Sequence, residues 1–234
     1  KGVDGYGDQL TETTPMCIGS LSKSFTALAV MQLAENGKIS LDTPVKNYIP
    51  YFEVTDPELS KAITVRDLLV QKSGLSRTDS IPSSAYSSTL EERVRALSAM
   101  EKAADRGEEF HYLNDNYNIL GLLIEEVTHT SYASYMKNNV FLPLGMNETT
   151  ADYSAIQQTK RQGYTSIFGF SKTMRQSVPR YDIPSGYIVS TLQDMEHYVA
   201  FLLDPDEHIL SKEGIETMRT AGKNSDYGMG WHIK

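Results

Sequence analysis

The chain has few of the residues that mark several large classes of protein. Its 234 residues include one cysteine, Cys17, which excludes an internal disulfide and any cysteine-rich zinc or iron–sulfur site. No run approaches the roughly 20 apolar residues that span a bilayer, so no transmembrane segment is predicted. Positive charge is also scarce, since 22 Lys and Arg stand against 30 Asp and Glu, a net charge of −8. An acidic chain binds phosphate backbones poorly, and no nucleic-acid partner is expected.

The chain also lacks a start methionine and the apolar core of a signal peptide, since it opens with Lys1. It is therefore expected to be processed or to be a piece of something longer. Hydrophobic residues make up 40% and charged residues 22%, values that indicate an ordinary globular protein. Because no repeat or linker divides the sequence, residues 1–234 are predicted to form a single domain.

Periodicity and capping residues predict a mainly helical chain. The strongest helix is expected from Ser20 to Asn36, before Gly37. Further helices are predicted at 64–71 with Thr64 as N-cap, at Leu90–Ala104, at 116–130, at 131–142, and after a capping box at Thr191 through Leu203. Residues 76–88 and 147–183 are predicted to be loops, the second with short strands, and residues 227–234 to begin a strand.

Ser20-Leu21-Ser22-Lys23 is the strongest chemical signal, an S-x-x-K pattern at the start of the strongest predicted helix. Residues i and i+3 share one helix face, so the Lys23 amine is expected to reach the Ser20 hydroxyl. The N–H groups at the helix start favour an oxyanion there. Burial near this positive potential would lower the pKa of Lys23, which a base at neutral pH requires. A serine beside a base is the general pattern for acyl transfer.

Tyr112-Leu113-Asn114 is the second signal, on a segment just before the apolar helix that contains Gly121. A phenol in this position can shuttle a proton, and the amide two residues on can hold a substrate carbonyl. A Tyr near an Asn carries little information by itself, because the chain has 14 tyrosines.

Four blocks of the chain, in the right order, resemble the serine β-lactamase-like family. This family includes class C β-lactamases, low-molecular-weight penicillin-binding DD-peptidases, and related esterases and D-aminopeptidases. The blocks are CIGSLSKSFTALAVMQLAENGKISLDTPVKNYIPYF, ITVRDLLVQKSGL, Tyr112-x-Asn114 followed by NYNILGLLIEEVTHTSYASYMKNNVFLPLGMNET, and IPSGYIVSTLQDMEHYVAFLL. The resemblance implies an α+β protein with the serine β-lactamase/DD-peptidase-like fold, present here mostly as its helical part with an incomplete antiparallel sheet.

The resemblance also implies a role for each matched residue. Ser20 would be the nucleophile, and its backbone N–H would form one half of an oxyanion hole. Lys23 would be the general base or the partner that keeps the base ready. Tyr112 would shuttle the proton to and from the leaving group. Whether Lys23 or Tyr112 takes the proton of the serine stays open. Asn114 would orient the acyl side chain of the substrate.

The implied protein is a bacterial serine hydrolase that forms an acyl-enzyme on Ser20, without metal or cofactor. It would work outside the cytoplasm, as a periplasmic, secreted or cell-surface protein. Its implied substrates are β-lactams, peptides ending in D-Ala, amides or esters, among which the sequence does not choose. The alternative is a non-catalytic penicillin- or peptide-binding module, or an inactive fragment of one.

The sequence departs from the family at its ends. The third family motif, a strand with Lys or His, any residue and Gly, is expected beyond Lys234, and a first helix and strand before Lys1, so the domain is expected to be truncated at both ends. Lys72-Ser73-Gly74 has the right letters but matches a turn, and we reject it. The absent sheet would supply the second oxyanion donor, whose loss costs about 10²- to 10³-fold in rate. The chain alone is therefore expected to be inactive or unstable.

Other candidates have less support. Cys17 is a rival nucleophile to Ser20, but it is interpreted as a small buried apolar residue. The five histidines form no H-x-x-x-H or H-E-x-x-H pattern, and no G-x-S-x-G elbow occurs. Gln71-Lys72 stands where the family often has His-Thr, and this change is interpreted as a packing detail.

Overall fold

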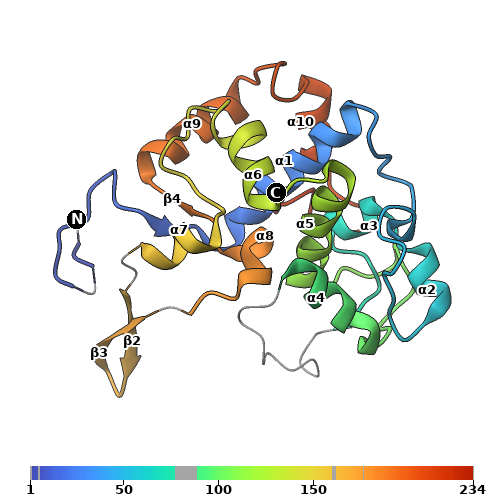
Figure 1. Cartoon of the computed structure of the whole chain (residues 1–234), viewed down its shortest axis with the longest axis horizontal. Helices are drawn as coiled ribbons and strands as arrows, with labels where there is room; N and C mark the ends of the chain where they lie inside the picture. The colour runs from blue at the N-terminus through green and yellow to red at the C-terminus, as the bar shows by residue number, and fades with distance from the viewer. Residues whose placement is uncertain (1, 5, 77–88, 160–161, 176, 234) are drawn as a thin grey trace.

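Helices fill most of the molecule (Figure 1), and the computed structural model describes every residue except 1, 5, 77–88, 160–161, 176 and 234. The helices are α1 (Ser22–Glu35), α2 (Pro57–Ala62), α3 (Val65–Leu69), α4 (Leu90–Ala96), α5 (Asn114–Thr128), α6 (Tyr132–Met136), α7 (Tyr153–Gln158), α8 (Ile183–Gly186), α9 (Leu192–Leu203) and α10 (Lys212–Arg219). Short 3-10 turns are η1 (Gly19–Leu21), η2 (Val45–Asn47), η4 (Leu97–Ala99) and η6 (Arg180–Asp182), and η5 (Lys137–Phe141) is π-helical. The strands are β1 (Met16–Cys17), β2 (Gln162–Ile167), β3 (Phe170–Arg175) and β4 (Val189–Ser190).

This architecture confirms the predicted α+β class with a helical majority and little sheet. β1 pairs antiparallel with β4, and β2 pairs antiparallel with β3. The predicted loop at 76–88 lies outside the described residues except for Ser76. Within the part of the chain that the structure describes, no helix has the length and apolar character needed to span a bilayer.

Helix α1 lies at the centre of the molecule (Figure 1), and every residue from Ser22 to Leu33 is buried. It is covered on several sides because it packs against α5, α8, η5 and α10. A helix buried all round has no separate polar face, and its polar side chains are accommodated by hydrogen bonds, such as those from the Thr26 hydroxyl to the Pro184 carbonyl and from the Gln32 amide to the Ile209 carbonyl. The predicted helix from Ser20 to Asn36 is confirmed, except that its first residues form the 3-10 turn η1.

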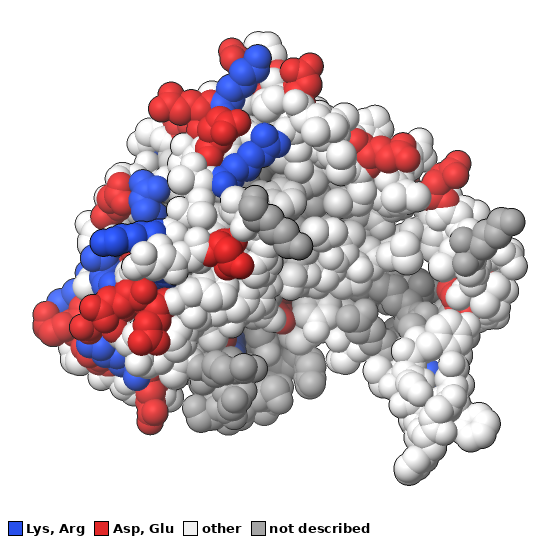
Figure 2. All heavy atoms as spheres, turned by 180° about the vertical axis from the view of Figure 1, so that it is seen from behind, with Lys and Arg blue, Asp and Glu red and all other residues white. Residues whose placement is uncertain are grey.

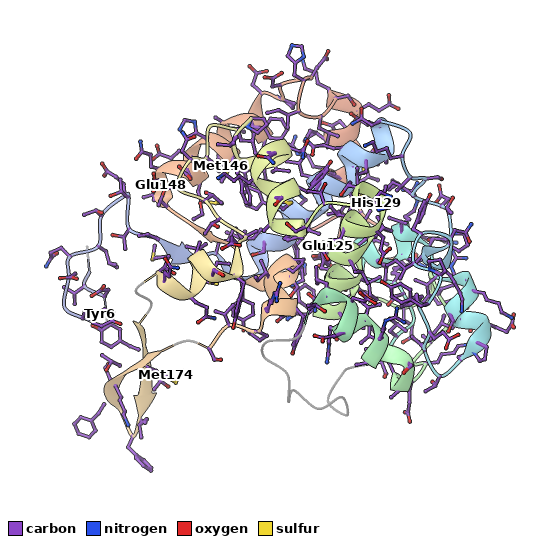
Figure 3. All side chains as sticks on the ribbon, in the orientation of Figure 1. Tyr6, Glu125, His129, Met146, Glu148 and Met174 are labelled. Carbon is purple, nitrogen blue, oxygen red and sulfur yellow. The ribbon has the colours of Figure 1, made fainter. Side chains whose placement is uncertain are left out.

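Helix α5 crosses the core beside α1 and confirms the predicted helix at 116–130. It ends at His129, which adopts a left-handed conformation with φ of 53°. Figure 3 labels His129 and Glu125 at this end, and the Glu125 carboxylate accepts the N–H of Tyr132 at 2.7 Å. At its middle, a Cβ on Gly121 would lie 2.5 Å from Pro184 Cγ, so only glycine lets α8 approach α5 this closely.

Threonine caps begin several helices, and those at Thr64 and Thr191 were predicted from the sequence. Thr64 forms a capping box at α3, and Thr89 forms another at α4. At α9, the Thr191 hydroxyl accepts the N–H of Asp194 at 3.1 Å, but the predicted box is only half made. The Asp194 carboxylate instead accepts the Thr149 hydroxyl at 2.6 Å, which ties α9 to the segment before α7.

Several predicted boundaries are wrong. The helix expected through Ala104 ends with η4, because the Met100 carbonyl accepts the N–H and the hydroxyl of Thr55. The helix expected at 131–142 is divided into α6 and the π-helical turn η5. α7 lies in a region predicted to be loop with strands, and α10 was not predicted at all. Both are short helices with an N-cap side chain, Asp152 and Ser211, and their apolar patterns are too brief to stand out.

Residues 227–233 form a tight turn rather than the predicted start of a strand. Tyr227 and His232 make an isolated antiparallel bridge across the turn. Gly230 has φ of +85°, and a Cβ there would lie 2.8 Å from Ser24 Cα. The backbone of this turn therefore lies directly against the first turn of α1.

Candidate active site

Ser20 lies where strand β1 gives way to helix α1. Gly19 before it has φ of 56°, a left-handed conformation that glycine adopts without strain. The Ile18 N–H donates to the Ile188 carbonyl at 3.0 Å, which anchors the start of η1 to the segment before β4. The Ser20 side chain is exposed, whereas the residues from Ser22 onward are buried. The fold thus presents one hydroxyl at the surface end of a buried helix.

Lys23 is fully buried one turn further on. Its Nζ donates to Asn114 Oδ1 at 2.8 Å and to the Ser185 carbonyl at 2.6 Å, and it lies 3.4 Å from Ser20 Oγ. Burial lowers the pKa of Lys23 to about 8, and the nearby charge of Asp182 acts in the opposite direction. Both ends of the S-x-x-K pattern therefore face each other, with the amine held by two short hydrogen bonds.

Tyr112 covers this amine from the solvent side. The Lys23 Nζ lies 4.7 Å from the centroid of its ring, and 40% of the tyrosine is exposed. Burial raises the pKa of Tyr112, while a hydrogen bond with Ser20 acts to lower it. The phenol is therefore protonated at neutral pH and lies beside the serine.

Gln71 holds the loop that carries Tyr112. Its backbone carbonyl accepts the N–H of His111 at 2.9 Å, and its Oε1 accepts the N–H of Leu113 at 2.9 Å. The Asn116 amide donates to the same Oε1 at 2.6 Å. Gln71 is buried and has φ of 60°. Gln71 thus fixes the backbone on both sides of Tyr112, with its side chain supplying the contact on the Leu113 side.

Asn114 is oriented by a buried carboxylate that the sequence did not single out, that of Asp182. The Asn114 Nδ2 donates to Asp182 Oδ2 at 3.3 Å, which leaves Oδ1 facing Lys23. Asp182 also accepts the Asn118 amide at 3.0 Å and the Ser185 hydroxyl. Burial raises the pKa of Asp182, and these hydrogen bonds oppose that shift.

A buried ion pair supports the same network from behind. Arg93 of α4 forms a two-pronged contact with Asp115 of α5, with both N–O distances 2.8 Å. The side chains are 9% and 3% exposed. Asn118 donates to Asp115 at 3.1 Å as well as to Asp182. One amide therefore connects the ion pair to the carboxylate that orients Asn114.

A hollow of about 340 Å³ opens beside Ser20, within the range of small-molecule sites. Tyr227 forms part of its wall and meets Tyr112 edge-on, with ring centroids 5.9 Å apart at 85°. The C-terminal turn closes the far side. The lining residues are Ile18, Ser20, Leu21, Tyr112, Tyr227, Gly230, Trp231 and His232.

The structure brings together the four residues that the sequence predicted, Ser20, Lys23, Tyr112 and Asn114. Asp182 and the C-terminal turn were missed, although Asp182 directly precedes the last matching block. No spacing rule marks a carboxylate that acts through a neighbouring amide, so only its position beside that block could have drawn attention to it.

The rejected candidates lie elsewhere. Lys72 is buried outside the hollow and donates to the carbonyls of Glu108 and Lys223. Cys17 is half-buried, and its thiol donates to the Gly186 carbonyl at 3.3 Å. Among the described residues, no group of three or more His, Cys, Asp and Glu could hold a metal ion.

The fold is that of penicillin-binding proteins and serine β-lactamases. Among solved structures, an octameric penicillin-binding protein homologue from Pyrococcus abyssi is 30% identical, with a TM-score of 0.80 over 96% of this chain and 55% of its own. The sequence pattern of the Beta-lactamase family matches residues 3–234, and the chain belongs to this family.

Curated relatives agree with this assignment. Protein flp of Staphylococcus aureus (strain COL) is 33% identical over 87% of this chain and 43% of its own length. A putative penicillin-binding protein, PbpX, of Bacillus subtilis (strain 168) is 28% identical over 98% of this chain and 57% of its own length. The chain therefore spans about half the length of these relatives.

Proposed function

We propose that this protein is a serine hydrolase that acts through an acyl-enzyme on Ser20. The observation that carries the proposal is the approach of the buried Lys23 Nζ to within 3.4 Å of the exposed Ser20 Oγ. Because the pKa of Lys23 is lowered to about 8, part of the amine is neutral near pH 7 and can accept a proton. Contacts of this kind are often long before a substrate binds and shorten in the complex.

In the acylation step, Ser20 Oγ attacks the carbonyl carbon of the substrate and its proton passes to Lys23 Nζ. The carbonyl becomes a tetrahedral oxyanion, which the N–H groups of η1, directly before α1, stabilise, the Ser20 N–H among them. Collapse of this intermediate breaks the bond to the leaving group. That group takes its proton through the Tyr112 hydroxyl, whose raised pKa keeps it a donor.

In the deacylation step, water attacks the ester on Ser20 and gives up a proton by the reverse of the same route. The new C–O bond forms the carboxylic acid product, and Ser20 Oγ regains its proton as the ester bond breaks. Asp182 takes no proton in either step. It keeps the Asn114 amide turned so that Oδ1 faces Lys23.

The proposed substrates are carbonyl compounds with a modest acyl side chain: β-lactams, D-Ala-ended peptides, amides or esters. The aromatic walls of the hollow, Tyr112, Tyr227 and Trp231, support an apolar group beside the carbonyl. The name of the Bacillus subtilis relative, a putative penicillin-binding protein, supports the β-lactam and peptide classes. We further propose that the protein works outside the bacterial cytoplasm, where such substrates occur.

The test is intact-protein mass spectrometry of the full-length protein after incubation with a fluorophosphonate and, separately, with a penicillin. We expect one adduct per chain, and we expect it to disappear in Ser20→Ala. Cys17→Ala is the matched control, since it removes the rival nucleophile three residues away and should keep the adduct.

An adduct that survives Ser20→Ala, or that never forms on the full-length protein, contradicts the proposal. An adduct on Ser20 without turnover of any ester, amide or β-lactam would instead favour a penicillin- or peptide-binding module, which captures the ligand but does not release it.

A further inference from the structure

The hairpin formed by β2 and β3 projects away from the rest of the molecule (Figure 1) and ends in apolar side chains. Ile167 pairs with Phe170 across its last rung, and Phe168 and Gly169 form the turn with φ of 51° and 83°. Phe168 is 98% exposed and Phe170 79%. Two phenyl rings in water at one tip are unusual for a soluble protein and mark a surface that meets a partner.

The charged residues of the hairpin strands are basic, opposite in sign to the net charge of the chain. Strands β2 and β3 contain no Asp or Glu but contain Lys172 and Arg175, in a chain of net charge −8, whereas the N-terminal segment at the hairpin base contains Asp4 and Asp8. Figure 2 shows the projecting hairpin as a mainly uncharged surface, in contrast to the densely charged face on the opposite side of the molecule. Lys172 comes two residues after Phe170 on the same strand, so both side chains lie on one face.

The stem of the hairpin is polar and is held at its base. Thr165 pairs with Lys172, and Ser166 pairs with Ser171, so hydroxyl groups separate the apolar tip from the body. The Tyr164 hydroxyl donates to the Asp4 carbonyl at 2.5 Å. Figure 3 places Tyr6 of the N-terminal segment near this base, on the side of Met174. Ile167, Phe168 and Phe170 therefore gather at the tip, while Tyr164 and Met174 are exposed nearer the base.

We propose that the tip of the β2–β3 hairpin inserts into an anionic lipid surface. Phe168, Phe170 and Ile167 would enter the boundary between headgroups and acyl chains, where aromatic rings are favoured. Lys172 would stay at the level of the lipid phosphates, which attract basic residues. The two strands satisfy each other's backbone groups, so the tip carries few unpaired N–H and C=O groups into the interface.

A second copy of the chain is a less suitable occupant. A stable protein interface buries about 1,200 Å² or more, whereas each aromatic ring contributes roughly 150–250 Å². Three apolar side chains on a narrow, convex tip fall well short of that area. A lipid surface needs no matching groove, and Lys172 near the tip complements its negative charge.

The experiment is cosedimentation of the protein with vesicles of phosphatidylcholine and phosphatidylglycerol, compared with vesicles of phosphatidylcholine alone. We expect binding to the anionic vesicles that weakens as salt is added. The double variant Phe168→Ser, Phe170→Ser should bind at least about tenfold more weakly. Leu203→Ser is the matched control, because Leu203 on α9 is 82% exposed and far from the hairpin in sequence. That variant should bind like the unmodified protein.

A second measurement, of tryptophan fluorescence, keeps an aromatic ring at position 168. The chain has one tryptophan, Trp231, so Phe168→Trp adds a single reporter at the tip. Its added fluorescence should shift to the blue with anionic vesicles, and Lys172→Glu in the same background should reduce the shift.

The proposal is overturned if the unmodified protein does not sediment with anionic vesicles, or if the double variant binds as tightly as Leu203→Ser. It is also overturned if sedimentation velocity shows a dimer that the double variant dissociates while vesicle binding is unchanged. In that case the tip docks on a second copy.

Discussion

The Lys23 amine donates to the Asn114 amide oxygen at 2.8 Å, and this contact joins the two halves of the candidate site. Lys23 comes from the first turn of α1 and Asn114 from the first turn of α5. The geometry places the amine between a fixed acceptor and the hydroxyl of Ser20.

Replacing Lys23 by methionine should abolish acylation. The thioether keeps most of the buried volume but cannot accept the Ser20 proton, and loss of a positioned base typically costs 10²- to 10⁴-fold. The measurement is the rate of fluorophosphonate labelling by intact mass. Lys38→Met, on an exposed lysine, is the control and should label normally. Equal rates in the two variants would remove Lys23 from the mechanism.

The acylation rate should rise with pH through about 8 and level off above it. Burial lowers the pKa of Lys23 from its usual value to about 8, so the neutral amine that accepts the proton accumulates only above that pH. Because burial penalises the charged amine in the folded protein, Lys23 lowers the stability of the fold below about pH 8, and this loss fades as the pH rises to about 10.5. A labelling profile that is flat between pH 6 and 9 would contradict the assignment.

Asp182→Asn should move this pH profile to lower pH. The charge of Asp182 raises the pKa of Lys23 against the effect of burial, so its removal lets that pKa fall further. The measurement is the midpoint of the labelling rate against pH. Asp204→Asn, on an exposed carboxylate, should leave the midpoint unchanged. A merely structural role for Asp182 would lower the rate at every pH without moving the midpoint.

Arg93→Met should destabilise the fold by about 3–5 kcal/mol, because it leaves the buried Asp115 carboxylate without its partner. Lys61→Met removes one member of an exposed pair with Glu58 and should change stability little. Urea unfolding of the two variants gives the comparison. A loss in Arg93→Met no larger than in Lys61→Met would show that the buried pair does not support α4 and α5.

Gly230→Ala should displace the C-terminal turn from α1. Its Cβ would meet Ser24 Cα at 2.8 Å, and φ of +85° strains any residue with a side chain. We expect a loss of roughly 1–3 kcal/mol in stability and weaker binding in the hollow. In Gly186→Ala the new methyl meets nothing within 4 Å, so this control should be nearly neutral. Thermal unfolding and ligand titration would separate the two effects.

Much of the fold could be predicted because its signals are local. Apolar spacing over 20–36 and 116–130 predicted α1 and α5, and the threonine caps predicted where α3 and α9 begin. The misplaced boundaries are set by contacts between residues that lie far apart in the sequence. The helix after Leu90 stops where Met100 accepts hydrogen bonds from Thr55, and the turn at Gly230 is shaped by α1.

The sequence by itself determined the nucleophile candidate and its amine, since i and i+3 on a helix meet in any fold. It also determined the family, through four ordered blocks. Only the tertiary structure decided how Asn114 is turned and which carboxylate acts on Lys23. Only the tertiary structure, too, places the turn at 227–233 beside Ser20, where it forms the far wall of the hollow. The physical reason is that burial and charge act through space, and the residues they join here, Lys23, Asn114 and Asp182, lie far apart along the chain.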